Sequence, residues 1–255
     1  MKLLATDYDG TLHYGEGIMQ DDLDAIRQWK EDGNLFVIVT GRSMQSIDEQ
    51  IKKFGLPCDY VISNNGGMVF DAAGKEMMAN YLDYVTAVDI IYAMKEMDNV
   101  ASYVVNDGFY RHKIVVDPGV TDHRYPHLQP DLSEEEVLDM GKYAQLVVSM
   151  SSADAAYEMA EQINHFFGAM VTAYANNCVV DVVPKGVSKS TGLDFVIEFA
   201  RVDDQDVYAI GDSYNDIPML ENAANSYAIA MAPEEVQNQA LEVVDSIHSL
   251  LHSIA

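Results

Sequence analysis

The chain contains few cationic residues. It has 15 Lys and Arg against 41 Asp and Glu, and a formal net charge of −26. Nucleic acids and anionic membranes attract proteins through extended fields of Lys and Arg, so this balance excludes both partners for a general electrostatic surface. It favours solubility. An anionic substrate has to be drawn in by a few local cations that overcome a repulsive surface.

Cysteines and long apolar runs are also scarce. Cys58 and Cys178 are the only cysteines and lack a metal-type spacing, so we expect reduced, buried thiols. No apolar run approaches the roughly 20 residues that cross a bilayer. Asp7 and Asp9 lie within the first nine residues, which is unlike a signal peptide. We expect a cytoplasmic monomer or small homo-oligomer with neither a nucleic-acid nor a membrane partner.

The first 80 residues alternate between strand-like and helix-like patterns. Continuous apolar runs with β-branched residues are typical of strands buried in a parallel sheet, whereas apolar residues at helical spacing predict the intervening helices. Asp21 or Asp22 is expected to cap the first helix and Ser43 the second. The order βαβαβ predicts right-handed crossovers. The expected strands are 2–6, 35–40 and 60–63, and the helices run from 21 or 22 to 33 and from 43 to 54.

The pattern changes after about residue 80 and changes back near residue 184. Adjacent strands with few helices indicate an α+β layer: helices 85–97 and 153–167, strands 102–106, 109–116, 145–150, 171–175 and 179–183, and a proline-containing connector, 117–130. Alternation then returns, with a helix from Ser188, strands 207–210 and 227–230, and a long C-terminal helix through Val236 and Ile254. We therefore predict an α/β doubly wound, Rossmann-like parallel-sheet core (1–81 and 184–255) interrupted by an inserted α+β domain (82–183).

Two carboxylates, Asp7 and Asp9, follow the first strand in the segment Asp-Tyr-Asp-Gly-Thr. Side chains two apart on a strand share a face, so both acids can enter one pocket, where they repel unless a cation or a shared proton offsets the charge. An EF-hand calcium loop would need Gly at its sixth position and Glu at its twelfth, and Leu12 and Ile18 stand there. An acidic strand end with no function is the remaining alternative.

Two further strand ends carry polar residues. Thr40 and Gly41 can offer a hydroxyl and a backbone N–H to a phosphate oxygen. Asp212, Asn215 and Asp216 have the i, i+3, i+4 spacing that places side chains on one face of a helical turn. Ligands bind outside the carboxyl ends of strands in open parallel sheets, so these residues predict one rim with oxygen ligands for a hard cation such as Mg²⁺.

A phosphate surrounded by acids also needs a fixed cation. Lys189 opens the helix that follows Ser188, so a rigid element fixes its position, whereas Lys185 precedes Gly186 in a hinge. We favour Lys189. An acidic helix turn stabilised by the helix dipole, and a solvated linker charge at Lys185, are the structural alternatives.

Together these motifs resemble the four ordered motifs of the haloacid dehalogenase (HAD) superfamily of phosphatases. They are Asp7-Tyr8-Asp9-Gly10-Thr11, Thr40-Gly41-Arg42, Lys189, and Gly211-Asp212 with Asn215-Asp216. The position of the insertion, and the phrases Ser63-Asn64-Asn65-Gly66 and Gly186-Val187-Ser188-Lys189, are similar to the Cof-type group with a class C2B cap. The chain departs from the pattern at Ser190, where Gly is common.

The resemblance implies a magnesium-dependent phosphatase. Asp7 attacks phosphorus to form an aspartyl-phosphate, and Asp9 protonates the leaving oxygen. The metal ligands implied are Asp7, Asp9 through its backbone carbonyl, Asp212 and Asp216, the last directly or through water. Phosphate contacts fall to Tyr8, Thr40, Gly41, Lys189 and Asn215, while Arg42 and Asn65 are possible substrate contacts.

The insertion, acting as a cap, is expected to choose the substrate. It holds five Lys and Arg against 16 Asp and Glu, which favours a small sugar or polyol monophosphate over a highly charged nucleotide. Arg111, Lys113 and Arg124 are its candidate substrate contacts. A phosphosugar mutase that uses the same aspartyl-phosphate, or a non-catalytic phosphate-binding protein, remains the alternative.

Overall fold

The computed structural model describes residues 1–15 and 17–254, and the chain divides into two compact units. One unit comprises residues 1–42, 46–78 and 188–255, and the other comprises 43–45 and 79–187. The boundaries deduced from the sequence, 82 and 184, stay a prediction. Within the described part of the chain, no helix is long and apolar enough to cross a membrane.

The first unit is built on a sheet of mainly parallel strands. Its order is β13-β12-β11-β1-β2-β3-β4-β5, and the pairs from β13 to β3 are parallel while β3 and β4 are antiparallel. The strand bounds are Leu3–Asp7 (β1), Leu35–Val39 (β2), Tyr60–Ser63 (β3), Met68–Asp71 (β4), Glu76–Ala79 (β5), Val207–Gly211 (β11), Asn225–Ile229 (β12) and Glu242–Val244 (β13).

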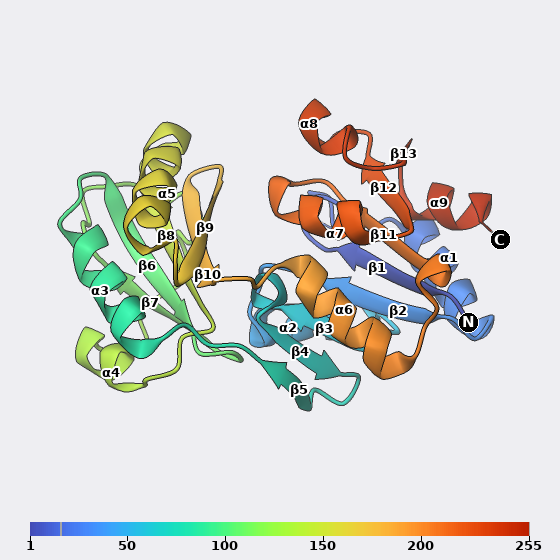
Figure 1. Ribbon diagram of the computed structural model, residues 1–255, viewed down its shortest axis with the longest axis horizontal. Coiled ribbons are helices and arrows are strands. Elements are labelled where there is room, and N and C mark those ends of the chain that lie inside the picture. The colour runs from blue at the N-terminus through green and yellow to red at the C-terminus, as the bar shows by residue number, and fades with distance from the viewer. Residues whose placement is uncertain (16, 255) are drawn as a thin grey trace. The chain divides into compact units, whose positions relative to one another are not determined.

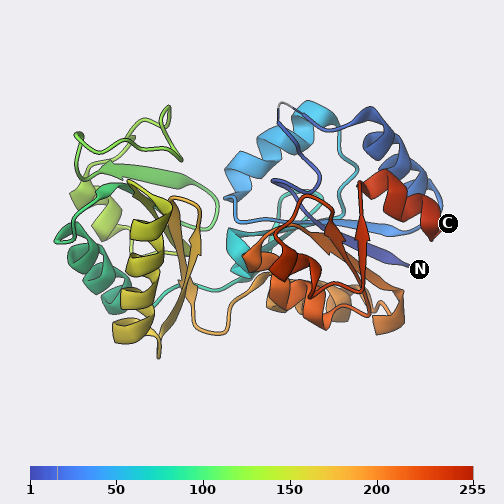
Figure 2. The same cartoon turned by 90° about the horizontal axis from the view of Figure 1, so that it is seen from above.

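Helices cover both faces of this sheet, as the doubly wound prediction requires (Figure 2). Alternate strand residues such as Leu3, Ala5 and Val37 form one buried cluster with Leu193 and Leu220 of the helices on that face. The helices are Gln20–Glu31 (α1), Met44–Phe54 (α2), Lys189–Ala200 (α6), Ile217–Asn222 (α7), Glu234–Gln237 (α8) and Ile247–Ser253 (α9). The chain proceeds outward from β1 in both directions, so the switch in strand order lies between β1 and β11.

The second unit has an antiparallel sheet with helices on one face (Figure 1). Its strand order is β7-β6-β8-β10-β9, and the helical face forms a separate core. The bounds are Val100–Asn106 (β6), Arg111–Val115 (β7), Gln145–Met150 (β8), Val171–Asn176 (β9), Val179–Pro184 (β10), Tyr84–Lys95 (α3), Glu134–Asp139 (α4) and Ala153–Phe167 (α5). The unit is therefore α+β, as the sequence predicted.

The predicted long C-terminal helix is wrong. The segment instead forms α8, the edge strand β13 and α9. Backbone bonds to β12 outweigh the helical spacing of the apolar residues: the N–H of Ala230 donates to Val244 O and that of Leu241 donates to Ser226 O. Ser246 then begins α9, because its side chain accepts from the N–H of Ser249.

Three smaller expectations also need correction. The first helix begins at Gln20 after Met19, and the buried carboxylate of Asp22 accepts from the N–H of His248 on α9 instead of capping its own helix. Ser43 precedes α2, but its hydroxyl has no hydrogen-bond partner among the described residues. Three elements, β4, β5 and α4, were not among those predicted from the sequence. For β4 and β5 the sequence did contain a signal, because Gly66-Gly67 and Gly74 are turn residues on either side of the apolar run of β4.

Candidate active site

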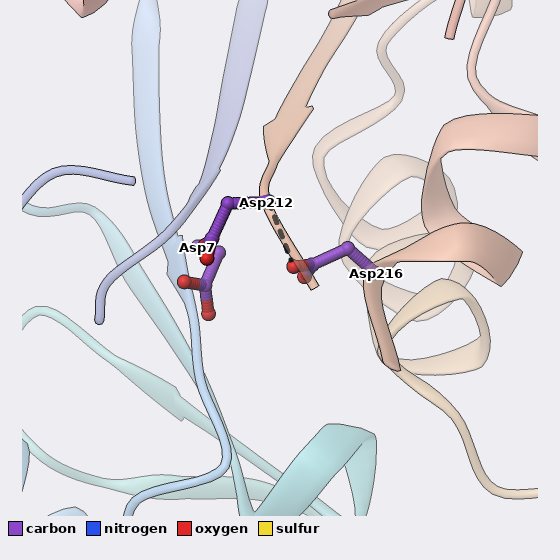
Figure 3. Close-up of side chains that lie close together, drawn as sticks. All are labelled: Asp7, Asp212 and Asp216. Carbon is purple, nitrogen blue, oxygen red and sulfur yellow. Dashed lines mark hydrogen bonds between the residues drawn. The ribbon is translucent and has the colours of Figure 1, made fainter. Parts of the chain in front are cut away.

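The predicted motifs meet at one edge of the parallel sheet. Asp7 ends β1, Thr40 follows β2 and Asp212 follows β11, and these three strands are neighbours in the order β11-β1-β2. Parallel neighbours end at the same edge, so residues more than 200 positions apart become adjacent. Figure 3 shows the side chain of Asp212 extending from the end of β11 toward Asp7.

Asp7 is a buried carboxylate paired with a buried lysine. Its side chain is 6% exposed and that of Lys189 is 1% exposed, with 2.5 Å between Lys189 Nζ and Asp7 Oδ1. Lys189 is the first residue of α6, which begins as predicted because Ser188 accepts from the N–H of Thr191. Lys189 Nζ also lies 2.6 Å from Oδ1 of Asp216. One ammonium group thus bridges two carboxylates.

The charges at this position depend on burial and on each other. Burial raises the pKa of Asp7 well above its ordinary value, and Asp216 and Asp212 add to the increase while Lys189 opposes it. Burial also raises the pKa of Asp212, against a hydrogen bond from Thr11. Burial alone would lower the pKa of Lys189, but the carboxylates of Asp216 and Asp7 outweigh it, so this pKa lies above its ordinary value. The ammonium remains charged, and three carboxyl groups face it.

Asp7, Asp212 and Asp216 form an acidic triad that fits a hard divalent cation. One carboxylate oxygen from each lies within 4.8 Å of the others, and oxygen ligands are those that Mg²⁺ prefers. Gly10, with φ +93°, leaves this space open, since a Cβ there would collide with the Asp212 carboxylate. Thr11 Oγ1 donates to Asp212 Oδ1 at 2.7 Å. The sequence analysis did not single out Thr11 for this contact, and only its place in the first motif could have indicated it.

The carboxylate of Asp216 is held by an ammonium group and two backbone N–H groups, whereas that of Asp212 accepts from two hydroxyls. Asp216 Oδ1 accepts from Lys189, and its Oδ2 accepts from the backbone N–H groups of Asp212 and Ser213 at 3.1 and 2.9 Å. Figure 3 marks the bond to Asp212 with a dashed line. Asp212 precedes the 3₁₀ turn Tyr214–Asp216, so the two acids meet through this capping contact rather than along one helical face, as the spacing predicted.

Asp9 and Arg42 form a bidentate pair. Arg42 Nε donates to Oδ2 at 2.7 Å and Nη2 donates to Oδ1 at 2.6 Å. The guanidinium also lies over the ring of Tyr8, with its Cζ 5.0 Å from the ring centroid. Tyr8 is buried, which raises its pKa to about 12, and its hydroxyl donates to Gln50. The side chain of Tyr8 therefore serves packing, and any phosphate contact there belongs to its backbone.

Three of the predicted phosphate-binding residues, Thr40, Gly41 and Asn215, lie on the loops after β2 and β11, and the possible substrate contact Asn65 lies with them on the turn after β3. The backbone N–H of Asn65 donates to Thr40 O at 3.0 Å, and Asn215 Nδ2 donates to Asn65 Oδ1 at 2.9 Å. Thr40 Oγ1 accepts from the N–H of Arg42 at 3.1 Å. A Cβ on Gly41 would lie 3.1 Å from Asn65 Oδ1. The absence of a side chain at Gly41 therefore lets the side-chain amide of Asn65 pack against its backbone.

The three candidate cations of the second unit make contacts within that unit. Lys113 is buried, and its ammonium contacts Asp122 Oδ2 and the carbonyl of Tyr125, both at 2.6 Å. Arg111 and Arg124 lie over the ring of Tyr125, with Cζ 5.9 and 5.7 Å from its centroid. These contacts give Lys113 a structural role and leave its part in substrate selection a prediction.

A family model and individual relatives both match nearly the whole chain. The family model of the haloacid dehalogenase-like hydrolases matches residues 4–255. The chain is 23% identical over 272 residues to a 5-amino-6-(5-phospho-D-ribitylamino)uracil phosphatase of Bacillus subtilis, covering 96% of this chain and 93% of that protein. It is 24% identical over 269 residues to the pyridoxal phosphate phosphatase of Escherichia coli, covering 99% of this chain and 98% of that protein.

Solved structures show the same fold. A phosphatase of the haloalkanoate enzyme superfamily from Bacteroides thetaiotaomicron superposes with a TM-score of 0.83 at 26% identity, covering 100% of this chain and 94% of that chain. A sugar phosphatase of HAD subclass IIB superposes with a TM-score of 0.80 at 22% identity, covering 100% and 98%. The family model spans nearly the whole chain, and the chain therefore belongs to the haloacid dehalogenase-like hydrolases, a family in which these relatives are phosphatases.

Proposed function

We propose that the chain is a magnesium-dependent phosphatase that hydrolyses a small phosphomonoester through an aspartyl-phosphate on Asp7. One observation carries this proposal: the buried carboxylate of Asp7 is paired with the ammonium of Lys189, and one of its oxygens lies within 4.8 Å of oxygens of Asp212 and Asp216. A nucleophile, a fixed cation and oxygen ligands for a metal thus converge on one point, which is the arrangement that phosphoryl transfer needs.

Asp7 is proposed to attack phosphorus in line, forming a bond from its carboxylate oxygen to phosphorus as the ester oxygen leaves. Lys189, already bound to Asp7 Oδ1, orients the carboxylate and offsets the charge of the phosphoryl oxygens. Asp9 gives a proton to the leaving oxygen and then takes one from the water that hydrolyses the aspartyl-phosphate. Thr40, Gly41 and Asn215 are proposed to hold the phosphate or to orient the residues beside it.

Asp7, the backbone carbonyl of Asp9, and Asp212 are the proposed holders of Mg²⁺. Asp216 Oδ1 is bound by the ammonium of Lys189 and its Oδ2 by two backbone N–H groups, so a contact through water suits it better than direct ligation. When bound, the cation supplies positive charge to the carboxylates and polarises a phosphoryl oxygen. Burial, and to a lesser extent the neighbouring acids, raise the pKa of Asp7 and of Asp212, and a bound cation would favour the charged form of both carboxylates.

A sugar or polyol monophosphate is the proposed substrate class. The net charge of −26 disfavours polyphosphates. The relatives above are named for small phosphorylated metabolites, including pyridoxal phosphate, and one solved structure is named a sugar phosphatase.

The test is release of both phosphate and p-nitrophenol from p-nitrophenyl phosphate, with and without Mg²⁺. Steady release of both products supports hydrolysis, whereas one stoichiometric burst of p-nitrophenol without phosphate release supports transfer to a second hydroxyl, as in a mutase, or a receiver that only traps phosphate. Asp7→Asn should abolish turnover, because an amide is a poor nucleophile, and Asp9→Asn should leave slow release, since general acid catalysis contributes about 10²–10⁴-fold. Asp98→Asn, on an exposed loop, is the matched control. Full activity in Asp7→Asn would refute the assignment of Asp7 as the nucleophile. If the wild type hydrolyses p-nitrophenyl phosphate, a panel of phosphorylated metabolites identifies the substrate.

A further inference from the structure

The side-chain amide of Asn65 contains a buried donor that the protein leaves unused. Asn65 is 1% exposed, and its Nδ2 has no hydrogen-bond partner in residues 1–15 and 17–254. Its Oδ1 accepts from Asn215, and this bond fixes the amide orientation. An unpaired buried N–H group is costly, so its presence in a folded protein calls for a partner that binds there.

The backbone at Asn65 is also held in an uncommon conformation. Its φ and ψ are 55° and 34°, the left-handed region that non-glycine residues rarely adopt. Two contacts maintain it: the N–H of Asn65 donates to Thr40 O at 3.0 Å, and the next residue, Gly66, packs so closely on the backbone of Ser188 that a Cβ there would collide with its carbonyl. The turn is thus wedged between the loop after β2 and the start of the lysine-bearing helix α6.

The unused donor lies beside residues already proposed to bind phosphate. A Cβ on Gly41 would be 3.3 Å from Asn65 Nδ2, and Asn215 contacts the other end of the same amide. Asn215 Nδ2 donates to Asn65 Oδ1, so Asn215 contributes to phosphate binding by orienting the side-chain amide of Asn65. An anionic oxygen is the acceptor that gains most from a free amide N–H, because charge-assisted hydrogen bonds are stronger than neutral ones.

We propose that Asn65 Nδ2 donates a hydrogen bond to a non-bridging oxygen of the bound phosphoryl group, with Asn215 as the residue that positions the amide. The inference rests on the proposed phosphatase function and adds one phosphate-binding residue to it. It also explains why the turn after β3 keeps a strained, buried asparagine against Gly41.

The experiment measures orthophosphate binding to the Mg²⁺-loaded protein by calorimetry, and the thermal midpoint without phosphate. Asn65→Gly keeps a residue that tolerates the left-handed backbone but removes the amide. Asn65→Asp keeps an acceptor for Asn215 but replaces the free donor with an anionic oxygen. Both should weaken orthophosphate binding about tenfold or more. Asn99→Gly is the matched control: Asn99 is exposed with φ 70°, and its replacement should change binding less than about twofold.

A structural role would give the opposite pattern. If both Asn65 variants bind orthophosphate as the wild type does, the inference is overturned, and it is overturned equally if the affinity loss appears only in Asn65→Gly and not in Asn65→Asp. Weaker binding in both variants, with a thermal midpoint within about 2 °C of the wild type, supports it. A wild type that neither binds orthophosphate nor hydrolyses phosphomonoesters would refute the proposed function itself, and this inference with it.

Discussion

Asp212→Asn should stabilise the protein when no divalent cation is present and abolish its response to Mg²⁺. The oxygens of Asp7, Asp212 and Asp216 lie within 4.8 Å of one another. Two unit charges at that separation repel by about 3 kcal/mol at an effective dielectric constant of about 20. Lys189 and partial solvent exposure of Asp212 offset part of this energy, so we expect a net gain of about 1–2 kcal/mol. The gain corresponds to a thermal midpoint about 2–8 °C higher for a chain of this size.

The size of this gain in stability depends on pH. Burial raises the pKa of Asp212 above its ordinary value of 3.8, so the metal-free folded protein binds this proton more tightly than the unfolded chain does. That contribution to stability is complete below the ordinary pKa and is lost as the pH rises through the raised one. The advantage of Asp212→Asn in EDTA should therefore be larger at pH 8 than at pH 4.5.

Thermal unfolding of both proteins, in EDTA and in Mg²⁺, checks the reasoning. The wild type should gain about 2.7 kcal/mol at a Mg²⁺ concentration 100 times its Kd, while the variant should gain almost nothing. Asp98→Asn, which changes the same charge on an exposed loop, should behave as the wild type does. A variant that is less stable than the wild type in EDTA at pH 8 would refute the repulsion among the acids, and one that keeps the full Mg²⁺ response would show that Asp212 is not part of a metal site.

Two further substitutions test the geometry of the site. Gly10→Ala places a Cβ against the carboxylate of Asp212 and should reduce the Mg²⁺-induced rise in thermal midpoint by at least half. Gly74→Ala is the control, because Gly74 has a similar φ of +76° but open space around the added Cβ. Equal effects of the two substitutions on the Mg²⁺ response would refute the collision with Asp212. Lys189→Met leaves the buried carboxylates of Asp7 and Asp216 unpaired and should lower the free energy of unfolding in urea by about 3–5 kcal/mol. Lys52→Met removes one partner of an exposed pair and should lower it by less than about 1 kcal/mol. Similar losses in the two variants would mean that Lys189 is not the buried partner.

The elements that the sequence predicted well are those whose signals are local. Continuous apolar runs gave β1, β2 and β11, and Ser188 gave the start of α6. The C-terminal segment failed because Val236, Ala240 and Val243 have helical spacing by coincidence, while the chain there pairs with β12. Strand pairing is a long-range contact, and a periodicity within one segment carries no information about it.

The sequence by itself determined the chemistry available to this protein and its order along the chain. Asp7, Thr40 and Asp212 could be assigned to one rim, because the carboxyl ends of neighbouring parallel strands must share an edge. Only the tertiary structure decided how these groups contact one another. It paired Asp9 with Arg42, bound both oxygens of Asp216 with hydrogen bonds, and left Asn65 Nδ2 without an acceptor among the residues that the structure describes. Such contacts join residues far apart in the chain, and their distances follow from packing that no local pattern encodes.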